Sequence, residues 1–162
     1  MQVLENVDGE PLVDDDYMRI ALGLAESALE SNDVPVGAII VLENEIVSRA
    51  FNEKERTGDP TAHAEMLAIR RATQRLGIWR LSNATMYVTL EPCAMCAGAM
   101  IQARLGRLVF GTFDPKAGAA GSVLDILDAP WLNHQVTVKS GVLAAECSQL
   151  LSSFFHIIRR DG

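Results

Sequence analysis

Two cysteines in the middle of the sequence have the spacing of a metal site. Cys93 and Cys96 form a C-x-x-C pair, and Pro92 directly precedes the first of them. In a helix that starts here, residues i and i+3 point the same way, so both thiolates can share one metal ion. Proline is well tolerated at a helix start. The positive end of the helix dipole favours the thiolate form that metals bind.

A histidine and a glutamate about thirty residues earlier can complete this site, in the segment His63-Ala64-Glu65. A zinc enzyme uses three protein ligands and keeps one position open for water, and His63, Cys93 and Cys96 supply three. Zinc lowers the pKa of its water from about 15.7 to near 7. Glu65 is not needed as a ligand and can therefore move protons to and from this water. The pattern predicts one catalytic Zn²⁺ per subunit.

A C-x-x-C pair also occurs in redox dithiols and in structural zinc sites. A redox pair needs no partner histidine and glutamate, and a structural zinc normally has four protein ligands. Cys147 is the one spare cysteine, and it falls on the apolar stripe of the last predicted helix. We therefore expect Cys147 to be a buried core thiol and favour the catalytic interpretation of the pair. His134 and His156 are also compatible with ordinary surface positions.

The composition is that of a globular protein. Hydrophobic residues make up 49% of the 162 residues, which is enough for one domain with a core of its own. No apolar run reaches the roughly 20 residues of a membrane-spanning helix, and the acidic N-terminal segment differs from a signal peptide. Three cysteines are too few for a disulfide scaffold. We expect a cytoplasmic protein with no membrane partner.

The charge is unevenly distributed along the chain. The net charge is −7, and six of the 21 acidic residues lie within residues 1–16, which contain no lysine or arginine. From Tyr17 onward, 14 basic residues face 15 acidic ones, so the body of the chain is almost neutral. Charge alone therefore does not indicate a nucleic-acid partner.

Hydrophobic periodicity and turn residues predict a loose acidic arm over residues 1–13 and a single domain over residues 14–162. The predicted helices cover residues 14–30, 63–76, 93–102 and 143–159, and the predicted strands cover residues 36–42, 45–50, 84–90, 107–111 and 136–138. A polar loop spans residues 51–61. A long irregular stretch over residues 112–135 is expected to contain a short helix over 123–127.

The order of these elements predicts the fold class. The first two strands form a hairpin, and the later strand–helix–strand units imply parallel neighbours covered by helices on both faces. We therefore expect an α/β protein with a three-layer α/β/α architecture and a mixed five-stranded sheet.

Several segments together resemble the cytidine deaminase-like zinc deaminases, whose signature is H-x-E followed by P-C-x-x-C. Within that family, the chain is most similar to the bacterial branch that acts on tRNA. The similarity covers nearly all of the chain after the acidic arm. It is carried by residues 34–38, Asn52, residues 59–65, residues 87–100, residues 111–114, residues 118–122, residues 133–134 and residues 154–155.

The resemblance implies hydrolytic deamination of adenosine to inosine at the wobble position of a tRNA anticodon. It also implies a homodimer that binds the anticodon loop near the subunit boundary. By position, His63, Cys93 and Cys96 hold zinc and Glu65 moves protons. The residues expected to bind substrate are Asn52, which would hydrogen-bond the flipped base, Ala64 and Glu91, which would frame the pocket, and Asp114, His134 and Phe155, which would lie near the RNA.

Two features differ from that branch: the acidic arm, and a tail that ends at Gly162 with few basic residues. Two alternatives remain open at this point. One is a small-molecule deaminase acting on guanine, cytosine or cytidine, which would use the same zinc and the same Glu65. The other is a non-catalytic zinc-folded binding module, which the presence of Glu65 does not support.

Overall fold

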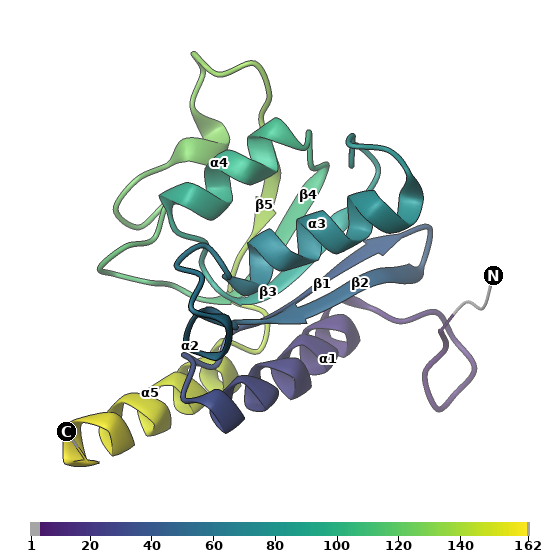
Figure 1. Cartoon of the computed structure of the whole chain (residues 1–162). Coiled ribbons are helices and arrows are strands. Elements are labelled where there is room, and N and C mark those ends of the chain that lie inside the picture. The colour runs from purple at the N-terminus through teal and green to yellow at the C-terminus, as the bar shows by residue number, and fades with distance from the viewer. Residues whose placement is uncertain (1–3, 162) are drawn as a thin grey trace.

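A computed structural model describes residues 4–161 (Figure 1). Its centre is a five-stranded sheet in the order β2-β1-β3-β4-β5. The strands are β1 (Gly37–Leu42), β2 (Glu45–Phe51), β3 (Thr85–Leu90), β4 (Arg107–Thr112) and β5 (Thr137–Lys139). β1 pairs antiparallel with β2 and β3, whereas the β3–β4 and β4–β5 pairs are parallel. The predicted hairpin and the mixed five-stranded sheet are both confirmed.

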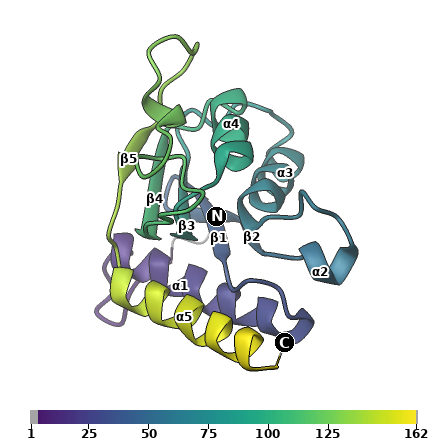
Figure 2. The same cartoon turned by 90° about the vertical axis from the view of Figure 1, so that its left-hand side faces the viewer.

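Helices cover both faces of the sheet, as Figures 1 and 2 show. α3 and α4 lie on one face, and α1 and α5 lie side by side on the other. The helices are α1 (Asp14–Ser27), α2 (Lys54–Thr57), α3 (Ala64–Leu76), α4 (Ala94–Gln102) and α5 (Ala144–Asp161), with short 3₁₀ turns η1 (Ala28–Ser31) and η2 (Ile126–Asp128). The predicted three-layer architecture is confirmed. In the described chain no helix is both apolar and long enough to cross a membrane.

Alternation along the central strands produces two separate cores, because successive side chains of a strand point to opposite faces. Met86 and Val88 of β3 pack toward α3 and α4, while Tyr87 between them joins the core under α1. In β4, Phe110 belongs to the core under α3 and α4, and Val109 belongs to the core under α1. The sheet therefore supports α3 and α4, whose N-terminal ends carry the predicted metal ligands.

Two predicted segments differ from the structure. The polar loop over residues 51–61 contains the one-turn helix α2, because buried Asp33 accepts hydrogen bonds from the N–H groups of Glu55 (2.7 Å) and Arg56 (3.2 Å). A cap from more than twenty residues away leaves no local signal in the sequence. The expected short helix over 123–127 is instead the 3₁₀ turn η2.

The described part of the acidic arm contacts the domain. Glu5 and Pro11 form an isolated β-bridge, and Leu4 and Leu12 pack against the core under α1. The sequence alone did not indicate these contacts. Residues 1–3 of the predicted arm lie outside the described residues.

Candidate metal and active site

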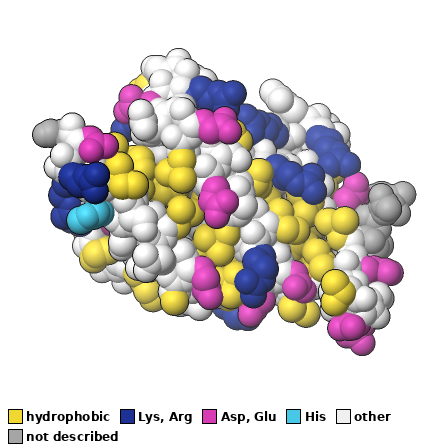
Figure 3. Space-filling model, turned by 90° about the horizontal axis from the view of Figure 1, so that it is seen from below, with side chains coloured by type: hydrophobic (Ala, Val, Ile, Leu, Met, Phe, Trp, Pro, Cys, Tyr) yellow, Lys and Arg dark blue, Asp and Glu magenta, His cyan; other side chains and the backbone are white. Residues whose placement is uncertain are grey.

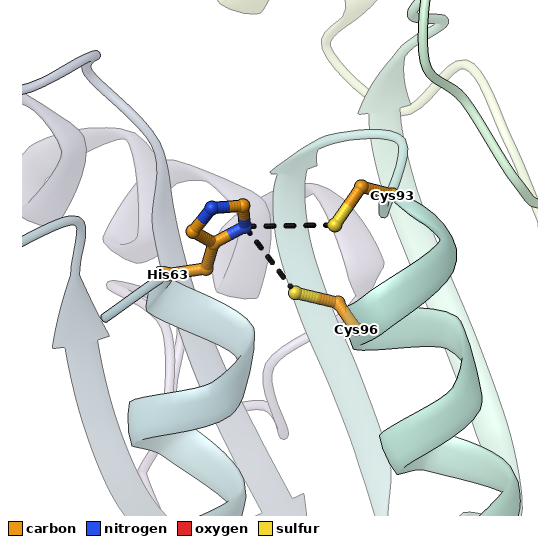
Figure 4. A group of neighbouring side chains, drawn as sticks. All are labelled: His63, Cys93 and Cys96. Carbon is orange, nitrogen blue, oxygen red and sulfur yellow. Dashed lines mark hydrogen bonds between the residues drawn. The ribbon is translucent and has the colours of Figure 1, made fainter. Parts of the chain in front are cut away.

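Two helix starts converge on one point. His63 is the N-cap residue of α3, and Cys93 is the N-cap residue of α4. Both have extended backbone conformations, with ψ angles of 148° and 175°, so the chain turns sharply into each helix. Cys96 lies one turn further along α4. The side chains of His63, Cys93 and Cys96 point toward one another across the gap between the two helices (Figure 4).

The distances between these ligand atoms fit a zinc ion. His63 Nδ1 lies 3.6 Å from Cys93 Sγ and 3.5 Å from Cys96 Sγ, and the three ligand atoms all lie within 4.8 Å of one another. In a tetrahedral site with ordinary zinc–nitrogen and zinc–sulfur bonds, two such ligand atoms are about 3.6 Å apart. The three side chains are therefore already placed as three corners of such a tetrahedron.

The two thiols differ sharply in acidity. Hydrogen bonds from Cys96 and His63 lower the pKa of Cys93 to about 4, which outweighs the effect of its partial burial. The hydrogen bond to Cys93 and burial both raise the pKa of Cys96. A second thiolate beside the first is disfavoured unless a cation offsets the repulsion. A soft divalent cation would do so, and this donor set of two thiols and one imidazole suits zinc.

Glu65 lies in the first turn of α3, two residues after His63, and its side chain is only 4% exposed. Burial raises its pKa to about 7. Glu65 lines the same cavity as His63 and Cys93. A carboxyl group with a pKa near neutrality can both accept and release a proton, which is what general acid–base catalysis needs.

Asn52 is held in a fixed orientation beside this group. Its Oδ1 accepts a hydrogen bond from the Ala64 N–H at 2.8 Å, and its own backbone N–H donates to the Val36 carbonyl at 3.1 Å. Because Oδ1 is engaged, the Asn52 amide can present its NH₂ group to a ligand as a donor. Ala64 is fully buried and contributes through this hydrogen bond.

These residues surround a cavity of about 710 Å³. Asn52, His63, Glu65 and Cys93 line it together with loop residues 113–117, and the outer half of α5 forms a further wall. This volume lies within the usual range for pockets that bind small molecules or single residues of a polymer. Asp114 and Phe155, both predicted to bind substrate, line the same cavity.

Glu91 lines the cavity, as expected for a residue that frames it, but its carboxylate is not free. It accepts hydrogen bonds from the backbone N–H groups of Asp114, Ala120 and Ser122, each at 3.0 Å, and a further one from the Ser122 hydroxyl. Burial alone would raise the pKa of Glu91, but these hydrogen bonds hold it below the usual value. Gly118 also contacts this carboxylate so closely that a Cβ atom would lie 2.3 Å from Oε1. Glu91 therefore fixes residues 112–122, which we call the rim loop.

Comparison with known proteins agrees with this site. A family model described as MafB19-like deaminase matches residues 13–159. A tRNA-specific adenosine deaminase from Bacillus subtilis (strain 168) is 48% identical over 147 residues, covering 91% of each chain. The chain belongs to this deaminase family.

Solved structures agree with the fold of this deaminase. One, from a study of tRNA deaminases that edit adenosine to inosine at the wobble position, has a TM-score of 0.81 and 43% identity. It matches 84% of this chain and 99% of that chain. A guanine deaminase from Nitrosomonas europaea has a TM-score of 0.72 over 94% of this chain, but at 22% identity it shares the fold alone. The predicted cytidine deaminase-like fold is confirmed.

His134 is not brought to the cavity of this deaminase. Its Nε2 lies 2.7 Å from the carbonyl oxygen of Leu105, just before β4 begins, whereas the cavity lies where β4 ends at Thr112. The expectation that His134 contacts substrate beside Phe155 therefore has no support within one chain. Cys147 is buried and packs beside Gly111, as predicted for a core thiol, and is not part of the metal group.

Several side chains that line the cavity were not singled out from the sequence, among them Lys54, Phe113, Lys116 and Arg159. Lys54 is brought there by α2, and Arg159 by the last turn of α5. Phe113 belongs to the rim loop and lies directly after the end of β4 and directly before Asp114. An aromatic side chain at the end of a central strand, directly before a predicted substrate-binding residue, was the signal that could have identified it.

Proposed function

We propose that this deaminase converts adenosine to inosine at the wobble position of a tRNA anticodon by zinc-dependent hydrolysis. The observation that carries the proposal is that His63, Cys93 and Glu65 line one cavity, with buried Cys96 completing the metal group behind them. This arrangement occurs in a chain that is 48% identical to a tRNA-specific adenosine deaminase over nearly its whole length. The metal group supports the reaction class, and the relatives support the substrate.

His63, Cys93 and Cys96 would hold the zinc ion, one per subunit. When bound, zinc supplies water that ionises near neutral pH and can attack the ring carbon that carries the exocyclic amine. Glu65 would take a proton from the attacking water and transfer it to the adjacent ring nitrogen. It then moves a second proton from the new hydroxyl group to the amine, so that ammonia leaves and a carbonyl group remains on the ring.

Asn52 would bind the base while this happens. Its oxygen is held by the Ala64 N–H, which leaves its NH₂ group to donate to an acceptor atom of the purine. Because the cavity encloses this group, an adenosine must leave the base stack to reach it. An unpaired anticodon loop offers such a base at low cost.

Cations near the cavity support an RNA substrate despite the net charge of −7. Lys54, Lys116 and Arg159 line the cavity, where they can contact backbone phosphates. Figure 3 shows the face of α1 and α5, on which acidic side chains lie among hydrophobic ones. The basic side chains Arg159 and Arg160 belong to the last turn of α5. Three basic side chains thus lie at the cavity beside five acidic ones, and two of the acidic ones, Asp33 and Glu91, are already engaged by backbone N–H groups.

The assembly and location are part of the same proposal. We infer a homodimer from the family resemblance, and the exposed apolar side chains of Val123 and Leu124, just after the rim loop, are suitable for an interface. A second chain could also bring its His134 toward the RNA. Because tRNA is the proposed substrate, we infer a cytoplasmic location. Sedimentation equilibrium of the zinc-loaded protein tests the dimer.

One preparation tested on several substrates decides the reaction. The purified zinc-loaded protein is offered an anticodon stem-loop with adenosine at the wobble position, and separately free adenosine, cytidine, cytosine and guanine. We expect inosine to form in the RNA and no turnover of the free compounds. Turnover of a free base or nucleoside without turnover of the RNA would overturn the substrate and favour the small-molecule alternative.

A further inference from the structure

An aromatic side chain on the rim loop is held in an exposed position. Phe113 directly follows β4, lines the cavity and is 51% exposed. Its ring makes an edge-to-face contact with Phe110, with 5.1 Å between ring centroids and an interplanar angle of 85°. Phe110 is fully buried in the core between the sheet and α4. Half of the Phe113 ring is therefore anchored, and the other half remains open to a ligand.

The backbone on both sides of this ring is also fixed, and by one residue. The Glu91 N–H donates to the carbonyl of Thr112 at 2.9 Å, just before Phe113. The carboxylate of Glu91 accepts from the N–H of Asp114 at 3.0 Å, just after it. The position of the Phe113 backbone is therefore set on both sides, and the edge-to-face contact with buried Phe110 orients the ring.

A second exposed ring lines the same cavity from α5. Phe155 is 43% exposed and makes an edge-to-face contact with Phe154, at 5.3 Å and 69°. Phe154 is buried, so this ring is also supported from below. Lys116 and Arg159 line the cavity beside these two rings. Exposed aromatic faces next to cations are the combination with which proteins bind unpaired nucleotides, by stacking on bases and pairing with phosphates.

We propose that Phe113 is a stacking platform for an unpaired base that adjoins the reacting adenosine, and that it determines the preference for an RNA loop over a free nucleoside. This rests on the proposed function. A free nucleoside has no neighbouring base to place on the ring, so it would lose this contact entirely. Stacking tolerates any base, because every base has a π face. Phe113 therefore recognises a single-stranded neighbour without reading its identity.

The test combines a protein change with a substrate change. kcat and KM are measured for the zinc-loaded wild-type protein and for Phe113→Leu, each with three stem-loops. One stem-loop is intact, and the others carry an abasic nucleotide on the 5′ or the 3′ side of the reacting adenosine. We expect Phe113→Leu to raise KM for the intact loop about 5- to 150-fold, the value of one stacked base, with kcat retained.

The abasic loops show whether the missing contact is a stack on the neighbouring base. One of the abasic loops should raise the KM of the wild-type protein by about the same factor as Phe113→Leu does for the intact loop. In Phe113→Leu, that abasic loop and the intact loop should have the same KM. Phe113→Tyr, which keeps the ring, should behave as wild type. Trp79→Leu is the matched control, because Trp79 is 57% exposed and does not line the cavity. It should leave all constants unchanged.

Three results overturn the proposal. One is an unchanged KM for the intact loop in Phe113→Leu. Another is an abasic loop that raises the KM of Phe113→Leu as much as it raises the KM of the wild-type protein. The third is that neither abasic loop raises the KM of the wild-type protein. In each case the wild-type protein still deaminates the intact loop, so the proposed function stands. If wild type does not deaminate the intact loop at all, the proposed function fails and this proposal fails with it.

Discussion

Glu65 and Glu91 are almost equally buried, at 4% and 2% exposure, yet their surroundings shift their pKa values in opposite directions. Glu65 lies beside the metal ligands, and burial raises its pKa to about 7. Glu91 is surrounded by N–H and O–H donors of the rim loop, and these lower its pKa. A buried carboxyl is suited to moving protons only when its charged form is left poorly stabilised.

The comparison divides the cavity into two parts with different tasks. In the proposed function, the floor, formed by His63, Glu65 and Cys93 with Cys96 behind them, carries out the chemical step. The rim loop, held by Glu91, places the substrate in that proposal. Changes at the floor should therefore lower kcat, and changes at the rim should mainly raise KM.

The largest effect is expected from loss of a metal ligand. Cys96→Ala removes one of three ligands, and we expect the variant to lose its zinc and all measurable activity. Metal analysis by mass spectrometry of the purified protein measures the zinc content. Cys147→Ala is the matched control, because Cys147 is an equally buried cysteine outside the metal group. Zinc retention in Cys96→Ala, or zinc loss in Cys147→Ala, would contradict the assignment of the ligands.

Glu65→Gln should act on chemistry alone. The amide has nearly the same shape but cannot carry protons, so kcat should fall by about 10²- to 10⁴-fold. KM should change little. Zinc content should stay at one ion per chain, because Glu65 is not needed as a ligand. A variant that loses its zinc would show that Glu65 holds the metal, and the proton-transfer role would have to be abandoned.

Glu91→Gln should act on the rim. The glutamine amide keeps one oxygen, but its NH₂ group faces N–H donors and cannot accept from them. Lost hydrogen bonds of about 1–3 kcal/mol predict a KM about 5- to 150-fold higher, with zinc retained. Hydrogen exchange of the rim loop should become faster.

Ser122→Ala provides the graded control for this change, because it removes only the hydroxyl donor to Glu91. Its effect on KM and on exchange should have the same direction and be smaller. If Glu91→Gln lowered kcat at constant KM while exchange in the rim loop stayed slow, Glu91 would belong with the floor, and the division would be wrong.

The smallest effect concerns a third carboxylate, at the other side of the domain. Asp14 accepts hydrogen bonds from Arg107 (2.8 and 3.0 Å), Lys139 (2.8 Å) and Tyr87 (2.7 Å). The hydrogen bonds from Arg107, followed by those from Lys139 and Tyr87, hold the pKa of Asp14 well below its usual value. This group should contribute to stability and not to activity.

Because the folded-state pKa of Asp14 is depressed, its contribution is fully present above the unfolded-state pKa of about 3.9 and is lost as the pH falls below that value. Asp14→Asn should lower the free energy of unfolding by about 1–2 kcal/mol at pH 7, allowing for solvent screening of the partly exposed cations. The difference should shrink below about pH 4. Urea unfolding of wild type and Asp14→Asn at pH 7 and below about pH 4 measures this difference in the free energy of unfolding. A difference that grew in acid would contradict the ion pairing.

The grouping of His63, Cys93 and Cys96, with Glu65 at the same cavity, was predictable because the pattern is local. Cys93 and Cys96 are one turn apart at a helix start that Pro92 marks, and His63 and Glu65 flank a single residue at another. Burial of β3 and β4 on both faces was also predictable, because strand–helix–strand units place parallel strands between two layers of helices, and the four central residues of each strand are buried. The signals for the metal group each span fewer than ten residues.

The roles of Asp33, Glu91 and Phe113 could not be predicted in the same way. Asp33 caps α2 from another segment, and Glu91 binds loop backbone more than twenty residues away. The Phe113 ring packs against buried Phe110, and Glu91 forms hydrogen bonds with the backbone on both sides of Phe113. His134, expected near the substrate, is hydrogen-bonded to the Leu105 carbonyl before β4 begins, at the end of that strand away from the cavity. Each role depends on which distant backbone group a side chain meets, and hydrophobic periodicity does not contain that information.

The sequence by itself therefore determined the chemistry of this protein: which side chains can hold a metal, which one can carry protons and which helices present them. The tertiary structure decided the shape of the rim loop, because the buried carboxylate of Glu91 accepts hydrogen bonds from three backbone N–H groups of that loop, more than twenty residues along the chain. The physical reason is the separation along the chain of the residues that set each feature. Ligand spacing is set by one helical turn, whereas a loop is fixed only after the fold has brought its distant partners into contact.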